Sequence, residues 1–249
     1  MTRTLPEHPR WLKRPPGTGA PPAARVFCFH HAGGSAALFR HWPDLLPRDI
    51  EPVAVQLPGR ADRLRERPFT EMPPLVDALA DVLAPVLDVP FACFGLSMGA
   101  KISWALAHGL GERGLPVPRA LYLAGAAAPG TPEGRSDWHV PDEQLVAYLR
   151  DMDGTPPEVF AHPELLAALL PTLRADLTLV DTFRFEPGRP LEMPIHAFAG
   201  LTDVEGGPDR MRGWGACTRG AFTLEALSCG HFLDAAGERR VAEVIAAGF

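Results

Sequence analysis

The chain has 249 residues, of which 46% are apolar and 22% are charged, the balance of a globular protein with a sizeable core. Its formal net charge of −6 argues against a general nucleic-acid-binding protein, which usually carries a basic surplus. No apolar run is long enough to span a membrane, and the N-terminus lacks the apolar segment of a secretory signal. Cys28 and Cys93 lie in apolar runs, where buried, reduced thiols are expected. We therefore predict a cytoplasmic protein.

Short apolar runs alternate with helical patterns along most of the chain. The runs are apolar nearly throughout, as expected for parallel strands that are buried on both faces. They lie at 25–30, 52–57, 91–94, 120–124, 195–199 and 222–227. Helical patterns lie between them, near 36–46, 72–87, 98–112 and 234–247. This alternation predicts an α/β fold with a mostly parallel central sheet flanked by helices.

The segment 131–190 has no convincing strand and interrupts this alternation. Helical patterns cover 141–152 and 162–183, and Pro171 is expected to kink the second one. The second pattern also places five apolar side chains on one stripe, namely Leu165, Leu169, Leu173, Leu177 and Val180. We predict a helical lid over the carboxyl edge of the sheet, with an extra pair of core helices as the alternative. The predicted organisation is a Pro-rich lead at 1–24, an α/β core at 25–130 and 191–249, and a helical lid insertion at 131–190.

The motif Gly95-Leu-Ser97-Met-Gly99 follows an apolar run and precedes a helical pattern, which is typical of a nucleophile elbow. A one-step turn from strand to helix strains the serine backbone and crowds the positions two residues before and after it, so glycine is needed there. The first amides of the helix carry partial positive charge, which suits a developing oxyanion. We predict Ser97 as a nucleophile, with a structural turn serine as the alternative. A phosphate loop is excluded because the spacing around Lys101 does not match it.

A serine hydroxyl needs a base to become a useful nucleophile. In this fold an acid and then a histidine follow the serine, each after a later strand. His231 follows the last apolar run and Asp203 follows the one before it, so we predict these two as base and acid. Glu205 is the first alternative to Asp203 as the acid, and Asp137 is the second.

The glycine-containing segment FHHAGGS at 29–35 follows the first core strand and predicts a second oxyanion donor. We assign the two donors to the backbone N–H groups of Met98 and Ala32. The adjacent histidines do not predict a metal site, because neighbouring strand residues face opposite ways and no third ligand has suitable spacing. We expect no metal and no cofactor.

These motifs belong to longer blocks that together resemble a known family. The blocks are FCFHHAGGSAALFRHW (27–42), VAVQLPGRADRLRERP (53–68), GLSMGAKISWALA (95–107), LRADLTLVDTFRF (173–185), PIHAFAGLTD (194–203) and WGACTRGAFTLEALSCGHFL (214–233). They resemble the type II thioesterases of polyketide and nonribosomal peptide assembly lines, which are α/β hydrolases with a helical lid. The resemblance implies hydrolysis of acyl groups from the phosphopantetheine arm of an acyl or peptidyl carrier protein. It places Ser97, Asp203 and His231 at the catalytic positions, and the lid beside the acyl pocket.

The chain departs from the family pattern at four positions near the predicted site. Leu96 and His30 stand where histidine and proline are usual, Cys229 stands where glycine is usual, and Val204 follows the acid where proline is common. None of these departures removes a catalytic group. Leu96 and His30 are expected to change the shape or polarity of the substrate pocket. Trp104 is a candidate for narrowing the acyl chamber, with core packing as the alternative.

Carrier proteins are usually acidic and this chain is itself net negative, so docking is expected to need a local basic patch. The candidates are Arg60, Arg63, Arg65 and Arg67, with a solvated arginine run as the alternative. We expect a monomer that binds neither nucleic acid nor membrane. Two other functions stay open: a serine esterase or acyltransferase of the same fold, and a non-catalytic scaffold that binds carrier proteins.

Overall fold

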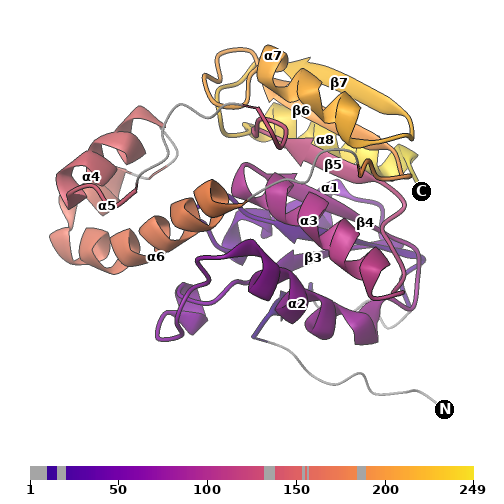
Figure 1. The fold of residues 1–249 in the computed structure, drawn as a ribbon, viewed down its shortest axis with the longest axis horizontal. Coiled ribbons are helices and arrows are strands. Elements are labelled where there is room, and N and C mark those ends of the chain that lie inside the picture. The colour runs from indigo at the N-terminus through magenta and orange to yellow at the C-terminus, as the bar shows by residue number, and fades with distance from the viewer. Residues whose placement is uncertain (1–9, 16–20, 132–137, 153–154, 156, 184–188) are drawn as a thin grey trace.

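The computed structural model of the chain describes residues 10–15, 21–131, 138–152, 155, 157–183 and 189–249 (Figure 1). Its centre is a seven-stranded sheet with the order β1-β3-β2-β4-β5-β6-β7. β1 pairs antiparallel with β3, and the other neighbouring strands are parallel. The strands are β1 (Leu12–Lys13), β2 (Ala24–Phe29), β3 (Ile50–Val55), β4 (Phe91–Leu96), β5 (Leu121–Ala124), β6 (Ile195–Gly200) and β7 (Phe222–Leu227). The predicted mostly parallel α/β sheet is confirmed.

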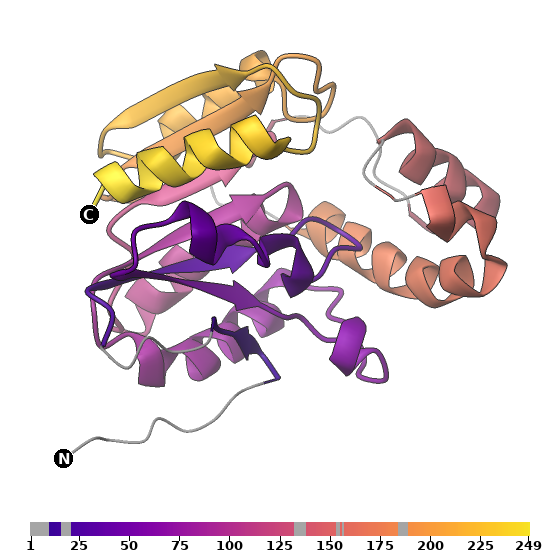
Figure 2. The same ribbon diagram turned by 180° about the vertical axis from the view of Figure 1, so that it is seen from behind.

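Helices cover both faces of this sheet, which explains why the inner strands are apolar on both sides (Figures 1 and 2). One face carries α2 (Met72–Leu83), α3 (Met98–Glu112) and the short α7 (Pro208–Met211). The other face carries α1 (Trp42–Leu45) and α8 (Ala235–Ala247). Cys28 and Cys93 are free thiols buried within these layers, as expected.

Prolines account for two differences from the predicted helices. The helix expected near 36–46 is two short turns, η1 (Ala36–Phe39) and α1, because Pro43 has no N–H to continue a helix and instead lies in the first turn of α1. The helix expected at 72–87 ends as α2 at Leu83 and continues as the tighter turn η3 (Ala84–Val86), which contains Pro85. Between β6 and β7, α7 and η4 (Arg212–Cys217) were too short to show a helical period in the sequence.

The segment between β5 and β6 is helical and lies beyond one edge of the sheet (Figures 1 and 2). It contains α4 (Asp142–Asp151), α5 (Pro157–Ala161) and α6 (Pro163–Thr182), and α6 continues through Pro171. Leu173 and Leu177 pack with side chains of α4 in a separate small core. Leu165 is 47% exposed, so the expected apolar stripe of α6 was wrong at its first turn, which lies outside that core.

Part of the predicted N-terminal lead joins the sheet. Leu12 and Lys13 pair with Val55 and Ala54 at the outer edge of β3. Within the part of the chain that the structure describes, no helix combines the length and the apolar character needed to cross a membrane.

Candidate active site

Ser97 occupies a strained turn between β4 and α3. Its φ of 56° and ψ of −116° lie in a region that non-glycine residues rarely adopt. Its N–H donates to the carbonyl of Ala124 at 2.8 Å. A Cβ on Gly95 would lie 2.2 Å from the carbonyl oxygen of Gly99, and a Cβ on Gly99 would lie 2.1 Å from that of Phe29. The turn therefore exists only with glycine at both flanking positions, as the motif predicts.

His231 lies in the loop between β7 and α8, against the carboxylate of Asp203. Its Nδ1 is 3.1 Å from Oδ1 and 3.0 Å from Oδ2 of Asp203, and both side chains are nearly buried. Burial alone would raise the pKa of Asp203, but the hydrogen bond and charge of His231 and the N–H groups of Gly206 and Glu205 outweigh it and lower that pKa. A carboxylate on Nδ1 holds the proton there and leaves Nε2 of the neutral ring free to accept one.

The alternative acids lie elsewhere. The carboxylate of Glu205 accepts a hydrogen bond from the hydroxyl of Tyr148 at 3.3 Å, so it faces α4 while Asp203 faces His231. Asp137 lies outside the described residues. Asp203 is therefore the carboxylate that the fold brings to the imidazole.

Ser97 lines two cavities. The first has a volume of about 500 Å³, and its lining carries five charged side chains, namely Lys101, Asp151, Asp181, Glu205 and Arg210. The second has a volume of about 360 Å³ and is lined by residues 31–35, by His231 and by side chains of α4 and α6. Ala32 and Tyr148 line both cavities, and His231 lines only the second. Ser97 and His231 thus share one cavity wall.

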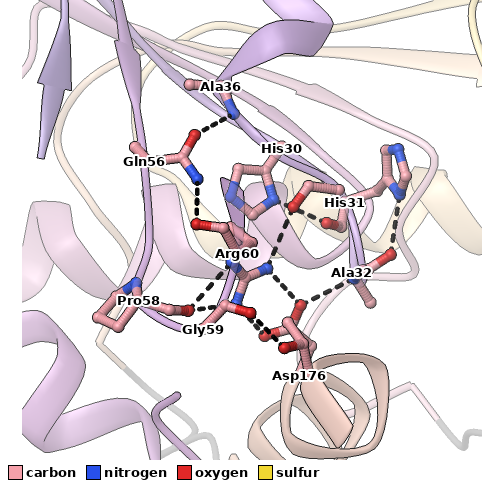
Figure 3. Close-up of polar contacts among 12 residues, drawn as sticks. His30, His31, Ala32, Ala36, Gln56, Pro58, Gly59, Arg60 and Asp176 are labelled. Carbon is pink, nitrogen blue, oxygen red and sulfur yellow. Dashed lines mark hydrogen bonds and ion pairs between the residues drawn. The ribbon is translucent and has the colours of Figure 1, made fainter. Parts of the chain in front are cut away.

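The 30–34 loop, which contains the predicted donor Ala32, is held by a buried polar network (Figure 3). Gly33 has φ +73° and donates its N–H to Oδ2 of Asp176 at 2.8 Å. Asp176 also binds the guanidinium of Arg60, which in turn donates to the carbonyl of Gly34 at 3.3 Å. The loop is therefore fixed by side chains that come from distant parts of the chain.

Two of the four arginines proposed for docking are buried, which corrects both sequence interpretations of them. Arg60 is 5% exposed and belongs to the network around Asp176. Arg63 is 4% exposed, donates to the carbonyl of Gln56 at 2.8 Å and lies 3.9 Å from the ring of Trp11. Both form hydrogen bonds inside the fold, so neither is available to a partner. Arg65 and Arg67 are exposed.

The three residues predicted for the substrate pocket lie in the core, and none lines either cavity. Leu96 is 3% exposed at the end of β4. His30 is 1% exposed, and its Nδ1 donates to the carbonyl of His31 at 2.8 Å. Trp104 is buried against His108 and Phe183, with ring centroids 4.2 and 6.0 Å away. The core-packing alternative for Trp104 fits this position.

Sequence reasoning missed Tyr148 and Asp176. Tyr148 lies on α4, lines both cavities and stays a proton donor, because burial and the nearby Glu205 carboxylate raise its pKa. Nothing in its sequence neighbourhood marks it. Asp176 does carry a signal: it lies one turn from Leu173 and next to Leu177, on the buried side of a helix, where an acid needs a partner.

Comparisons with known proteins identify the family of the chain. A family model described as a thioesterase domain matches residues 24–248. The gramicidin S biosynthesis protein GrsT of Aneurinibacillus migulanus is 36% identical over 209 residues, which cover 84% of this chain and 82% of GrsT. The thioesterase RedJ, from the prodiginine pathway of Streptomyces coelicolor, is 33% identical with a TM-score of 0.87 over 94% of this chain and 96% of RedJ. The type II thioesterase BorB, from the borrelidin biosynthetic cluster, is 34% identical with a TM-score of 0.85 over 96% of this chain and 97% of BorB. The likeness to type II thioesterases that the motifs predict is confirmed.

Proposed function

Because the chain belongs to the thioesterase family, we propose that it removes acyl groups from the phosphopantetheine arms of acyl or peptidyl carrier proteins, with Ser97, His231 and Asp203 as its catalytic residues. One observation carries the proposal: the strained Ser97 turn shares a cavity wall with His231, whose Nδ1 is held by the buried carboxylate of Asp203. Such an arrangement supplies a nucleophile, a base and a group that orients the base.

The proposed reaction has two steps. His231 Nε2 takes the proton of Ser97 as the hydroxyl attacks the thioester carbonyl, and the N–H groups of Met98 and Ala32 stabilise the oxyanion. The carbon–sulfur bond then breaks, and the protonated ring returns its proton to the departing thiolate. In the second step His231 activates water, which hydrolyses the acyl-serine and frees the enzyme. The nucleophile, the base and both oxyanion donors all belong to the chain itself.

The two cavities suggest how the substrate lies. His231 must reach the leaving sulfur, and it lines only the second cavity, so the pantetheine arm is placed there. Among the described residues that line this cavity, Arg40 is the only one with a permanent charge, which suits the phosphate of the arm. The acyl group then lies in the first cavity, between the core and the helical insertion.

The helices α4 and α6 are proposed as the lid of this site. Tyr148 of α4 and Leu177 of α6 line the first cavity, and Leu149 and Leu173 line the second. The insertion therefore forms walls of both substrate cavities. The partner is an acyl or peptidyl carrier protein, and the enzyme is expected to act as a monomer in the cytoplasm, beside its assembly line.

A direct test offers acyl-carrier proteins and acyl-N-acetylcysteamine thioesters to the wild type and to Ser97→Ala. We expect the substitution to lower kcat by at least about 10³-fold, because the covalent step is lost. A fluorophosphonate should label the wild type and not the variant. Equally slow cleavage by both proteins would reject the serine mechanism. A wild-type protein that the fluorophosphonate does not label would favour the non-catalytic scaffold.

A further inference from the structure

Asp176 and Arg60 form a buried bidentate ion pair beside the site, and we infer that this pair positions the 30–34 loop for catalysis. Nη1 of Arg60 lies 2.6 Å from Oδ2 of Asp176, and Nη2 lies 2.8 Å from Oδ1 (Figure 3). The two side chains are only 5% and 2% exposed. The inference rests on the proposed function, since it gives the pair a task in the proposed oxyanion site.

The pair holds the loop at two consecutive residues. Oδ2 of Asp176 accepts the N–H of Gly33 at 2.8 Å, and Nη1 of Arg60 donates to the carbonyl of Gly34 at 3.3 Å. The first bond fixes the peptide unit that joins Ala32 to Gly33. That unit is joined through the Cα of Ala32 to the unit that carries the Ala32 N–H, so fixing it restricts the directions in which the Ala32 N–H can point.

Arg60 is itself held in place by the segment after β3. Its Nε and Nη2 donate to the carbonyl of Pro58 at 3.1 and 3.0 Å. Gln56 donates from Nε2 to the carbonyl of Arg60 at 3.3 Å, and its Oε1 accepts the N–H of Ala36 at 2.9 Å. Buried, hydrogen-bonded side chains thus hold the loop at Gly33 and Gly34 and also hold the first residue of η1, Ala36.

A purely stabilising role does not account for this arrangement. A buried ion pair often stabilises a protein no better than well-packed apolar side chains of similar volume. The neighbours Leu173 and Leu177 already pack in the core of the insertion, so an apolar side chain at position 176 would continue their stripe. What a carboxylate adds there is an acceptor for the N–H of Gly33 and a partner for Arg60.

The position of this carboxylate couples the insertion to the chemistry. Asp176 lies on α6, whereas the loop that it holds follows β2 of the core. A displacement of α6 away from the core would break the bond to Gly33 and release the loop. Asp176 and Arg60 are therefore positioning residues whose loss should lower kcat with little change in KM, because the oxyanion contact forms only in the transition state.

The decisive experiment compares Asp176→Asn with Asp176→Ala. Both substitutions leave the Arg60 charge without its counter-charge, so both should lower the melting temperature. Only the asparagine keeps an oxygen that can accept the Gly33 N–H. On an acyl-N-acetylcysteamine thioester we expect kcat to fall about 10²-fold in the alanine variant and less than about tenfold in the asparagine variant, with KM changed less than about threefold in both. Equal kcat values in the two variants would overturn the inference.

A second variant separates positioning from folding. The double substitution Arg60→Met/Asp176→Leu replaces the ion pair by apolar groups and should recover much of the melting temperature that Asp176→Ala loses. We still expect its kcat to lie about 10²-fold below the wild type, because no acceptor faces Gly33. A stable double variant with wild-type kcat would refute the positioning role.

The control is the partly buried ion-pair cluster at the other end of β2. Arg25, 4% exposed, donates from Nε to Glu51, 14% exposed, at 2.8 Å. Arg25 also pairs with Asp88, and Glu51 also pairs with Arg14. Arg25→Met/Glu51→Leu should change stability without changing kcat, and a loss of kcat there as large as in the site variant would count against the inference. A wild type that cleaves no thioester would instead refute the proposed function, so the two failures are distinguishable.

Discussion

Two backbone segments meet at Ser97, and they are built in different ways. The turn at 95–99 is set mainly by its own sequence: a strand end, a helix start and two glycines lie within five residues, and its tertiary contacts are to backbone carbonyls of Phe29 and Ala124 on neighbouring strands. The loop at 30–34 is held by side chains from distant parts of the chain: Asp176 of α6 binds Gly33, and Arg60, which follows β3, binds Gly34. A locally determined segment tolerates changes elsewhere in the protein, whereas a segment held by tertiary contacts responds to them.

The largest expected effect comes from breaking the local turn. In Gly99→Ala the new Cβ would lie 2.1 Å from the carbonyl oxygen of Phe29, so backbone atoms must shift. We expect the free energy of unfolding to fall by about 3 kcal/mol and kcat to fall by about 10³-fold, because the nucleophile and the Met98 N–H are displaced together. Urea unfolding and thioester hydrolysis measure these effects.

Gly111→Ala is the matched control on the same helix. Its Cβ would meet nothing closer than Cγ1 of Val117 at 3.6 Å, so it should leave kcat unchanged and stabilise α3 by up to about 1 kcal/mol. A Gly99→Ala variant that behaves like this control would contradict the account of the turn.

A smaller loss of stability and of kcat is expected from backbone strain in the 30–34 loop. Gly33 has φ +73°, and its added Cβ would lie 3.3 Å from Cδ1 of Leu173, a side chain that can move. We expect Gly33→Ala to lower the free energy of unfolding by about 1–2 kcal/mol and kcat by about tenfold.

The control for backbone strain is Gly114→Ala. Gly114 has φ +64° with no atom within 4 Å of the added Cβ, so it carries the same strain without the loop's role. The two variants should lose similar stability, and only Gly33→Ala should lose kcat. A similar loss of kcat in both would show that the loop has no special part in turnover.

A modest effect is expected at Arg40, the residue that follows η1. Arg40 is exposed and lines the second cavity, where we place the phosphopantetheine arm. Arg40→Gln should lower kcat/KM about threefold for an acyl-phosphopantetheine and leave it unchanged for the matching acyl-pantetheine, which has no phosphate. An equal change for both substrates would place the phosphate elsewhere.

The smallest effect is a pH dependence of stability that belongs to the loop. Burial lowers the pKa of His31 to about 4 and holds that of His30 well below its ordinary value, with the Arg60 charge lowering it further. In the unfolded chain both histidines titrate at about pH 6.5. Between about pH 6.5 and 4 the unfolded state therefore binds more protons, and the free energy of unfolding falls as the pH falls. Urea unfolding at several pH values should show a shallower fall for His31→Gln, and an unchanged slope would contradict this.

The same contrast explains what the sequence could predict. The turn at Ser97 is a local sequence motif, and the order of strands places Asp203 and His231 after β6 and β7. All three residues can therefore be proposed from the sequence alone. The resemblance to type II thioesterases, which spacing made specific, is confirmed. The parallel sheet also follows from alternation along the chain.

The contacts that hold the 30–34 loop could not be predicted from the sequence, because they join residues that are far apart in the chain. Arg60 and Asp176 are 116 residues apart, and no periodicity links them. Arg60 and Arg63 lie among other arginines in a polar stretch of sequence. Such a stretch predicts exposed side chains, whereas the structure buries these two. The positions of Leu96 and His30 beneath the site depend in the same way on how the layers pack.

The two-residue strand β1 has a consequence for the protein in a crowded cell. The outer edge of β3 would otherwise offer unpaired N–H and C=O groups to any extended chain that approached it. Leu12 and Lys13 pair antiparallel with the carboxyl end of that edge, at Val55 and Ala54, and the Trp11 ring lies against the guanidinium of Arg63. At that end of β3 this short segment therefore leaves no open edge for a strand of another molecule to pair with, a structural role separate from bond cleavage.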